Sequence, residues 1–597
     1  MGDQIERYLK QVNSFQILFC LCVLGLLAYG QTVFYPFVHD DRVFIEHNPS
    51  ISDLSQPFDF FFKPSLPRAD SVIINTYYRP LLEIVYRIQY RLWGLDPGGY
   101  HLVNVLLHIT NSFLVYWIGW LLIRKKALAL GAAILFLIHP VQTQAVASIV
   151  GISNLLFSLW CLLSFLFYIQ SKEKSKNFAV IFSHGLAIIF FALALWTKEQ
   201  AVALPFLAVL YEYCFVGEDP KAVRQKWLRV AGLFIVLIGY LYWRELILGQ
   251  RTVLNAGNYE EFCLRILSIP QTLVMFVGLL VWPVNLHYYR CVNVLEPFWP
   301  AALMLVAVTG VLAAVIYFYK SNRNILVFGL GWFVMALAPT LNIAPVINEF
   351  SFASAAEHFL YFPLIGFLFF VVLIFVHFAE RIFRDQAPQR LMIFWGVIFF
   401  IFTAATIRQN TFWRGEIPLF ERTIIFEKHL GRTHILLARA YYFAREWDKS
   451  IEHFTHALNI MEQYAHQAQT QPTRNIYLGF IKGIHFDLAH CYEALGNTAA
   501  AIEQYKKALA IDPLDSVLYN SLGTQYLMRG DFDQARGQLQ KALELDPQNL
   551  MAMSNLAVCL IQQGNRSEAE GLLRKVLAID KNFVSARQNL EKFLTSE

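Results

Sequence analysis

Long apolar segments dominate the first two thirds of the chain. Between Val12 and Ile407 they come in runs of roughly 17–23 residues, separated by short polar stretches. A helix of that length crosses the hydrocarbon core of a bilayer. The pattern predicts twelve candidate transmembrane segments, at 12–36, 99–122, 127–148, 152–171, 177–196, 199–216, 228–248, 266–285, 299–319, 325–345, 358–380 and 391–408. No small-residue cleavage site follows the first run, so we expect a signal anchor.

Positive charges orient these segments, because Lys and Arg gather in cytoplasmic loops. Alternation from an inside N-terminus satisfies the clusters around Arg124, Lys172 and Lys221, and then fails at Lys320. One candidate therefore does not cross. We expect this to be 266–285, which carries a Ser-Ile-Pro sequence and can be re-entrant or interfacial. About eleven crossings remain, and they place the first loop and the C-terminal region on the same, non-cytoplasmic side.

A 34-residue period replaces the apolar segments after Arg408. The clearest copy is 516–549, and copies in phase occupy 482–515 and 550–583. Small residues and a terminal proline stand where a tetratricopeptide helix pair needs them, at Leu522-Gly523, Tyr526, Gly530, Ala535, Leu539, Ala542 and Pro547. A weaker copy is 431–464, residues 465–481 are an insertion, and 584–597 form a capping helix. Such arrays form concave binding surfaces. The alternative is that this array binds no ligand or partner and only packs against the membrane part.

The predicted fold is therefore all-α. A polytopic transmembrane helical bundle occupies 1–410, a linker helix 411–430, and an α-solenoid of tetratricopeptide repeats 431–597. The composition agrees, since 56% of the residues are hydrophobic and only 16% are charged. The net charge of +5 is accounted for by inside loops, and no basic patch indicates nucleic acid. The eight cysteines are scattered without metal-site spacing, so neither a zinc site nor a disulfide framework is predicted.

Two adjacent carboxylates, Asp40 and Asp41, follow the first apolar segment. Adjacent carboxylates at a membrane surface repel each other, so they persist there mainly when they bind a cation or accept a proton from a substrate. We predict that Asp41 or Asp40 is a catalytic base, with Asp41 as the first choice, and that the pair could hold a divalent cation such as Mg²⁺ or Mn²⁺. The alternative is that the pair only caps the following helix.

Further motifs give the chain a specific resemblance. It resembles the transmembrane and tetratricopeptide repeat-containing O-mannosyltransferases and their bacterial relatives, which are type C glycosyltransferases using polyprenyl-phosphate sugars. The matching stretches are Phe37–Arg42 with Asn48-Pro49, Tyr78–Leu81, Tyr100–Asn104 with His108, His139–Thr143, Lys198-Glu199, Pro339–Asn342 and Ala356–Pro363. The resemblance implies a polyprenyl-phosphate-linked sugar, mannose or another hexose, as donor. It also implies an acceptor polypeptide or glycan, and a lipid bilayer around the helical bundle. The resemblance covers about residues 1–420, and the repeats complete it.

Transfer from such a donor needs positive charge on the departing phosphate. Candidates are Arg79, Lys198, Arg290 and His358, with Glu357 at the start of a crossing on the same face as Asp40. We expect Asp40, Asp41, Glu357 and Arg79 to share one cavity mouth. Further candidates are His101, His139, Asn342 and Tyr361. The alternatives are that Arg79 snorkels, that Lys198 pairs with Glu199, and that the histidines are structural.

Four departures from the family's pattern leave the function open. Gln144 stands where the family usually has an acid, and His358 where it has Arg. Ile152 and Asn154 replace Arg and Asp, and the Asp-Tyr near Tyr288 is missing. The first hypothesis is a membrane glycosyltransferase, and the second is a repeat scaffold that lost the reaction. A transporter is disfavoured because internal inverted repeats are missing. Short loops favour a bacterial inner membrane over the endoplasmic reticulum.

Overall fold

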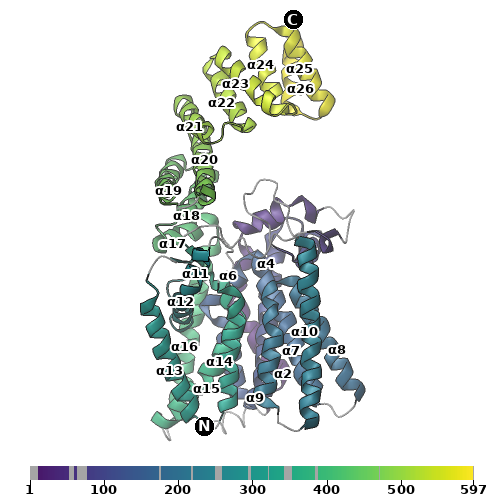
Figure 1. The fold of residues 1–597 in the computed structure, drawn as a ribbon, viewed down its shortest axis with the longest axis vertical. Coiled ribbons are helices and arrows are strands. Elements are labelled where there is room, and N and C mark those ends of the chain that lie inside the picture. The colour runs from purple at the N-terminus through teal and green to yellow at the C-terminus, as the bar shows by residue number, and fades with distance from the viewer. Residues whose placement is uncertain are drawn as a thin grey trace. The chain divides into compact units, whose positions relative to one another are not determined.

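The computed structural model describes residues 11–52, 59–63, 77–173, 177–216, 220–248, 259–293, 297–319, 322–341, 352–383, 387–468 and 471–595. The chain divides into two units, Met1–Phe426 and Glu427–Glu597 (Figure 1). Within the described ranges nearly everything is helical, as predicted. The only strands there are β1 (Cys291–Asn293) and β2 (Phe352–Ser354), which pair antiparallel. The predicted linker segment 411–430 contains α17 (Glu416–Phe426), which belongs to the first unit.

The first unit is a bundle of long helices that run up and down beside one another (Figure 1). In chain order they are α2 (Ser14–Tyr29), α3 (Pro80–Trp93), α4 (Pro97–Ile123), α5 (Lys126–Ile138), α6 (Thr143–Ala147), α7 (Ile152–Glu173), α8 (Asn177–Thr197), α9 (Leu204–Phe215), α10 (Pro220–Leu248), α11 (Tyr259–Leu267), α12 (Ile269–Val281), α13 (Trp299–Phe318), α14 (Arg323–Leu337), α15 (Pro363–Phe383) and α16 (Ala387–Asn410). All twelve segments predicted from hydropathy contain one or more of these helices.

Eight helices of the described chain are long and apolar enough to cross a membrane. A ninth span results if α5 and the helical stretch Pro140–Ala147 are one crossing, bent by 50°. The predicted segments 199–216 and 266–285 are shorter as helices. In the first, a 3₁₀ turn at Glu199–Ala203 leaves α9 with 12 residues. The chain is therefore a multi-pass membrane protein, and the number of eleven crossings stays a prediction.

The segment that was not expected to cross, 266–285, forms the short helix α12. Gln271 near its start donates to the carbonyl of Pro297, which lies just before α13. Leu286, just after it, accepts from Gln409 at the end of α16 and from Arg422 of α17. Residues at the start of α12 and just after it thus bond to other segments of the same unit.

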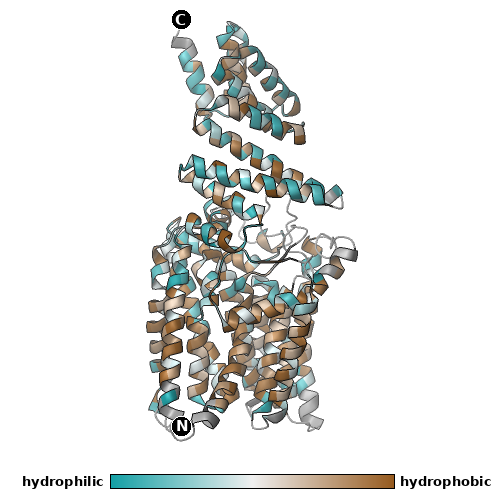
Figure 2. Ribbon diagram, turned by 90° about the vertical axis from the view of Figure 1, so that its left-hand side faces the viewer, coloured by the Kyte–Doolittle hydropathy of each residue, from teal (hydrophilic) through white to brown (hydrophobic). Residues whose placement is uncertain are grey.

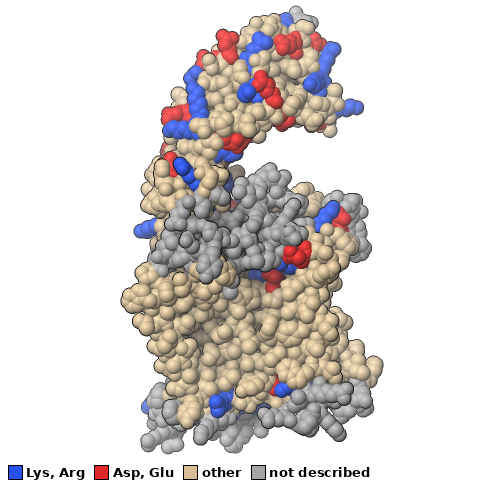
Figure 3. Space-filling view, viewed as in Figure 1, with Lys and Arg blue, Asp and Glu red and all other residues tan. Residues whose placement is uncertain are grey.

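Apolar side chains cover the outside of the bundle as well as its core. None of the apolar window Trp299–Tyr317 in α13 is buried by protein, and only 22% of that in α10 is. Figure 2 shows the helices of the bundle as predominantly hydrophobic, and Figure 3 shows few Lys, Arg, Asp or Glu on the middle of the face that it presents. Such a surface requires lipid to cover it. Inside, α14 and α15 approach closely, because a Cβ on Gly366 would lie 2.5 Å from the carbonyl of Gly329.

The second unit consists of four helix pairs and a final helix. The pairs are α18 (Gly431–Phe443) with α19 (Trp447–Gln467), α20 (Gln471–Ala494) with α21 (Thr498–Ile511), α22 (Ser516–Arg529) with α23 (Phe532–Leu545), and α24 (Leu550–Gln562) with α25 (Arg566–Ile579), followed by α26 (Val584–Thr595). Asp515 caps α22 by accepting from Val517 and Leu518, and Gly530 ends it with φ 85°. The inserted residues 465–481 lengthen α19 and α20.

Candidate active site

Asp41 is buried at the break that follows α2. Its side chain is a hydrogen-bond acceptor for the N–H of Val38 at 3.1 Å and of Val150 at 2.9 Å, and Ser148 Oγ lies 3.4 Å away. The residue is only 1% exposed. Burial raises the pKa of Asp41 to about 7, although the N–H donors of Val150 and Val38 act to lower it. Both oxygens are therefore engaged by the protein itself.

The turn that holds Asp41 is itself positioned by Asn104. The Asn104 amide donates to the carbonyls of Val146, Ser148 and Ile149, at 3.3, 2.8 and 3.3 Å. Asn104 is fully buried on α4. It matched the family motif but was not among the predicted site residues. Only the structure brings it next to the turn, because that turn is 42 or more residues away in the sequence.

Asp40 differs from its neighbour by facing outward. Its side chain is 42% exposed, and its Oδ2 accepts from the Tyr288 hydroxyl at 3.0 Å. His39 Nε2 lies 3.5 Å from the other oxygen. Asp40 is thus the more exposed carboxylate of the pair, whereas we expected Asp41 to be the base. Neither aspartate side chain caps the helical turn Arg42–Glu46.

Two cations lie at a second break, between α8 and α9. Arg79 binds both carboxylate oxygens of Glu199, at 3.0 and 2.6 Å. Lys198 Nζ donates to the amide oxygen of Asn154 at 2.6 Å. The pairing of Lys198 with Glu199 considered above is therefore wrong, and the snorkelling of Arg79 is replaced by a bidentate ion pair. Asn154, which stands where the family has Asp, gives the lysine a neutral partner.

The charges at this break leave a surplus cation. Burial alone would raise the pKa of Glu199, but Arg79 lowers it to about 2. Burial, reinforced by the charge of Arg79, lowers the pKa of Lys198 to about 7. Burial and the two cations hold the pKa of His358 well below its ordinary value, so its ring is neutral. Since Arg79 is neutralised by Glu199, Lys198 is the group that can attract an added anion.

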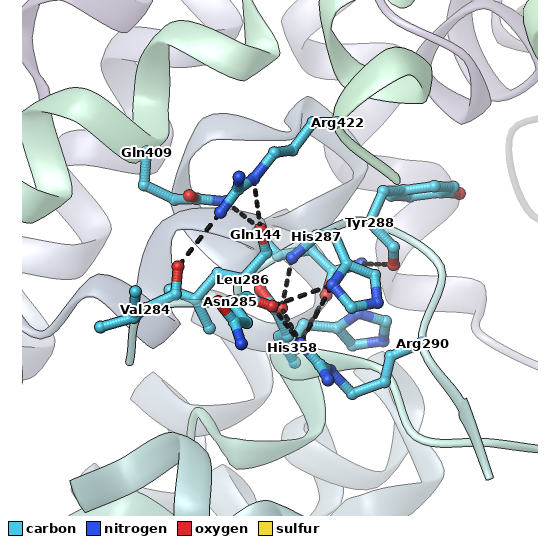
Figure 4. A network of polar contacts seen from close by, with 11 residues as sticks. Gln144, Val284, Asn285, Leu286, His287, Tyr288, Arg290, His358, Gln409 and Arg422 are labelled. Carbon is cyan, nitrogen blue, oxygen red and sulfur yellow. Dashed lines mark hydrogen bonds and ion pairs between the residues drawn. The ribbon is translucent and has the colours of Figure 1, made fainter. Parts of the chain in front are cut away.

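Glu357 forms a third polar group at the start of the 3₁₀ turn before α15. It is 2% exposed, and its Oε1 accepts from the His287 N–H at 2.7 Å, with Arg290 3.6 Å away. Burial raises the pKa of Glu357 to about 7, although Arg290 and the His287 N–H act to lower it. Figure 4 shows His287 and Arg290 side by side in this network. Arg290 is thus committed to Glu357 and to the Asn285 carbonyl.

Gln144 connects these groups. Its Nε2 donates to the Tyr288 carbonyl at 3.3 Å, and its Oε1 accepts from the His358 N–H at 3.0 Å (Figure 4). Tyr288 in turn bonds Asp40, and His358 lies within electrostatic range of Lys198. Tyr86 is buried, and its pKa is raised by burial and then by Asp41, and lowered by Arg79. Hydrogen bonds of Tyr288 and Gln144 thus connect Asp40 with the backbone of His358, while a cavity shared by the predicted carboxylates and cations stays a prediction.

The remaining candidates are buried side chains or lie outside the described residues. His108 bonds the Tyr361 hydroxyl at 2.8 Å and the Leu137 carbonyl at 2.9 Å. His139 bonds the Leu280 carbonyl at 3.1 Å and accepts the Val141 N–H. The side chains of His108, Tyr361 and His139 are thus buried and hydrogen-bonded, as expected if the histidines are structural. His101 is 1% exposed, with its ring edge-on to Tyr35. Asn342 lies outside the described residues.

The predicted divalent cation does not fit a preformed site at Asp40 and Asp41. In the described part of the chain, no three His, Cys, Asp or Glu side chains are grouped so that they could hold a metal ion. The Asp41 oxygens already accept from backbone N–H groups, and such donors would face a cation. Only Asp40 offers an accessible carboxylate, so we derive no step through a metal.

Comparison with known proteins shows what the chain is similar to. Four tetratricopeptide repeat models match residues 433–468, 483–515, 504–537 and 526–591. A protein O-mannosyl-transferase of Caenorhabditis elegans, F38B6.6, is 24% identical over 70% of the chain. The mouse protein O-mannosyl-transferase TMTC4 is 26% identical over 67% of it. The chain is similar to protein O-mannosyl-transferases. The resemblance predicted from the motifs is therefore confirmed.

The limits of this likeness are also clear. The matched region spans 59% and 60% of the length of those two O-mannosyl-transferases. A third relative, Tmtc2 of Drosophila melanogaster, is 29% identical over 49% of the chain and 31% of its own length. The three are animal proteins, so they lend no support to a bacterial origin. Among solved structures, the repeat protein YrrB is 15% identical, with a TM-score of 0.24, over 29% of this chain and 81% of its own.

Proposed function

We propose that the chain is an integral membrane glycosyltransferase. It moves mannose or another hexose from a polyprenyl-phosphate donor to a Ser or Thr hydroxyl of a polypeptide, or to a glycan, on the non-cytoplasmic face. One observation carries the proposal: hydrogen bonds through Tyr288 and Gln144 connect the accessible carboxylate of Asp40 to the backbone of His358, whose pKa is lowered by burial and by the charge of Lys198. The relatives named O-mannosyl-transferases support the same reaction class.

In this reaction Asp40 takes the proton from the acceptor hydroxyl. The acceptor oxygen then forms a bond to the anomeric carbon, and the bond from that carbon to the phosphate oxygen breaks. The bonding electrons leave with the polyprenyl phosphate, whose negative charge faces Lys198. Arg79 contributes its positive field, although Glu199 holds it in place. Tyr288 orients Asp40 by donating to one of its oxygens.

The repeats supply an acceptor site in this proposal. Four consecutive helix pairs form an array, and arrays of this kind present a concave face to a ligand. An extended polypeptide segment is the acceptor that such a face can hold. The array would then raise the local concentration of acceptor hydroxyls near the membrane unit.

One observation favours the scaffold alternative. Gln144 uses both ends of its amide on backbone groups, donating to Tyr288 and accepting from His358. A carboxylate at this position could not make both bonds, because it has no donor. The backbone around Gln144 therefore requires an amide and not the acid that the family usually has, as expected if the chemistry of this site has changed.

The purified protein in lipid vesicles decides between the two. Supplied with a polyprenyl-phosphate hexose labelled in the sugar and with a Ser/Thr-rich polypeptide, a transferase places label on the polypeptide. The label must be missing when Asp40→Asn is used. No label from any polyprenyl-phosphate hexose tested would leave the scaffold as the better reading.

A further inference from the structure

The backbone just before Asp40 is strained. His39 has φ 50°, which side-chain-bearing residues seldom adopt. Its N–H donates to Glu416 Oε1 at 3.1 Å, and the Arg42 guanidinium lies 3.3 Å from the same oxygen. Strained residues persist where their surroundings over-determine them. Here the partner is a carboxylate 377 residues away in the chain.

Glu416 is well placed to fix this turn. It is the first residue of α17, and its side chain is 17% exposed. The next turn of α17 supports the same loop, because the Phe420 ring meets the rings of His39 and Tyr288 edge-on, at 5.4 and 6.2 Å. α17 therefore contacts both Asp40's own loop and the tyrosine that binds it.

The far half of α17 contacts the Glu357 network. Arg422 donates to the carbonyls of Leu286 and Val284, at 3.2 and 3.1 Å (Figure 4). The Phe426 ring stacks on His287, with centroids 4.9 Å apart. One helix thus contacts both the loop that carries Asp40 and the loop whose His287 N–H binds Glu357.

We propose that Glu416 is a positioning residue for Asp40. It holds His39 in its strained conformation, so that the Asp40 carboxylate meets the Tyr288 hydroxyl and faces the acceptor. The inference rests on the proposed transfer reaction for its kinetic consequence. The structural consequence, that Glu416 immobilises the His39 turn, is independent of that reaction.

The test compares Glu416→Ala with Glu416→Gln in the full-length protein in vesicles. Alanine removes the carboxylate oxygen that accepts the His39 N–H. We therefore expect kcat to fall about tenfold to a hundredfold, which is the cost of a small misplacement of a reacting group. KM for the polyprenyl-phosphate sugar changes less than about threefold, because Lys198 and Arg79 are untouched. Glutamine restores kcat to within about threefold, since its amide oxygen still accepts the His39 N–H. Glu421→Ala, an exposed position on the same helix, is the control and leaves kcat unchanged.

Hydrogen exchange of the peptide containing His39 gives a readout without activity. Exchange is faster in Glu416→Ala than in the wild type, and close to wild type in Glu416→Gln. Equal exchange in all three proteins overturns the proposal, and so does a wild-type kcat in Glu416→Ala. If the wild type itself transfers no sugar, the proposed function fails, and the exchange comparison alone decides whether Glu416 holds the turn.

Discussion

The ammonium group of Lys198 donates to the amide oxygen of Asn154, 2.6 Å away, in the interior of the first unit. An amide satisfies the hydrogen bond but cancels no charge. Lys198 is 4% exposed, and the rings of Phe157 and Phe359 lie 5.8 and 6.0 Å from its ammonium. A buried cation with a neutral partner and aromatic walls is a group that gains from an incoming anion.

This arrangement predicts how donor binding depends on pH. The pKa of Lys198 is lowered to about 7, so the side chain is charged below neutrality and loses its proton above it. KM for the polyprenyl-phosphate sugar should therefore rise as the pH goes from about 6 to about 8.5. Lys198→Arg should flatten this profile, because arginine stays charged. The pKa of Glu357 is also raised to about 7. If the pH dependence of KM is unchanged in Lys198→Arg, Glu357 and not Lys198 causes it.

The two aspartates are predicted to differ in kind. Asp40→Asn should lower the transfer rate by about 10²–10⁴, the usual loss on removing a general base, without changing thermal stability. Glu46→Gln, an exposed acid in the helical turn that follows, is the control. Rates measured with labelled donor and acceptor should fall only for Asp40→Asn. Near-wild-type transfer by that variant would exclude Asp40 as the base.

Asp41→Asn should act on stability first. The amide that replaces the carboxylate turns one end of the side chain into a donor, which would face a backbone N–H of Val38 or Val150. A buried donor left without a partner costs about 1–3 kcal/mol. We expect a lower melting temperature in detergent together with reduced transfer. Full stability in this variant would show that the turn around Asp41 can rearrange.

Much of the architecture follows from the sequence because it depends on local periodicity. All twelve apolar segments contain helices, and the 34-residue repeat marks the helix pairs, since both signals are carried by neighbouring residues. The positions of the helix breaks could not be predicted in this way. Where 199–216 was expected as one crossing, the chain makes a 3₁₀ turn that delivers Glu199 to Arg79, and hydropathy does not register such a turn.

The sequence could select candidate site residues but not their partners. Motifs selected Asp40, Arg79, Lys198 and Glu357, and the structure gives each of them a polar partner in the first unit. They did not reveal which aspartate is exposed, nor that Asn154 partners Lys198, because both depend on contacts between distant segments. Glu416 carried no signal at all: it is one acid in a polar stretch after the last apolar helix, and its role emerges only from the 377-residue contact with His39.

A chelator tests the cation predicted for the aspartate pair. Asp41 already accepts backbone N–H groups on both oxygens, so a divalent ion would have Asp40 as its only accessible carboxylate there. We therefore expect the transfer rate to change less than about twofold when vesicles are treated with excess EDTA. A loss that Mg²⁺ or Mn²⁺ restores would show that the ion binds through a rearranged Asp40–Asp41 turn or through the donor phosphate.

Gly151 offers the sharpest test of how the Asp41 turn is built. A Cβ at this position would lie 2.2 Å from the carbonyl oxygen of Ala145, closer than any real contact, so the turn between them must open. That turn presents the Val150 N–H to Asp41. Gly151→Ala should therefore destabilise the protein by about 1–3 kcal/mol, the usual cost of overpacking a buried contact. It should also slow transfer by displacing Asp41 and its neighbour Asp40.

Gly131→Ala is the matched control, because a Cβ there meets nothing within 4 Å and Ala favours the helix. Melting temperatures and transfer rates of both variants in the same vesicles decide the matter: if Gly151→Ala behaves like Gly131→Ala, the close approach at Ala145 does not set the geometry of the site.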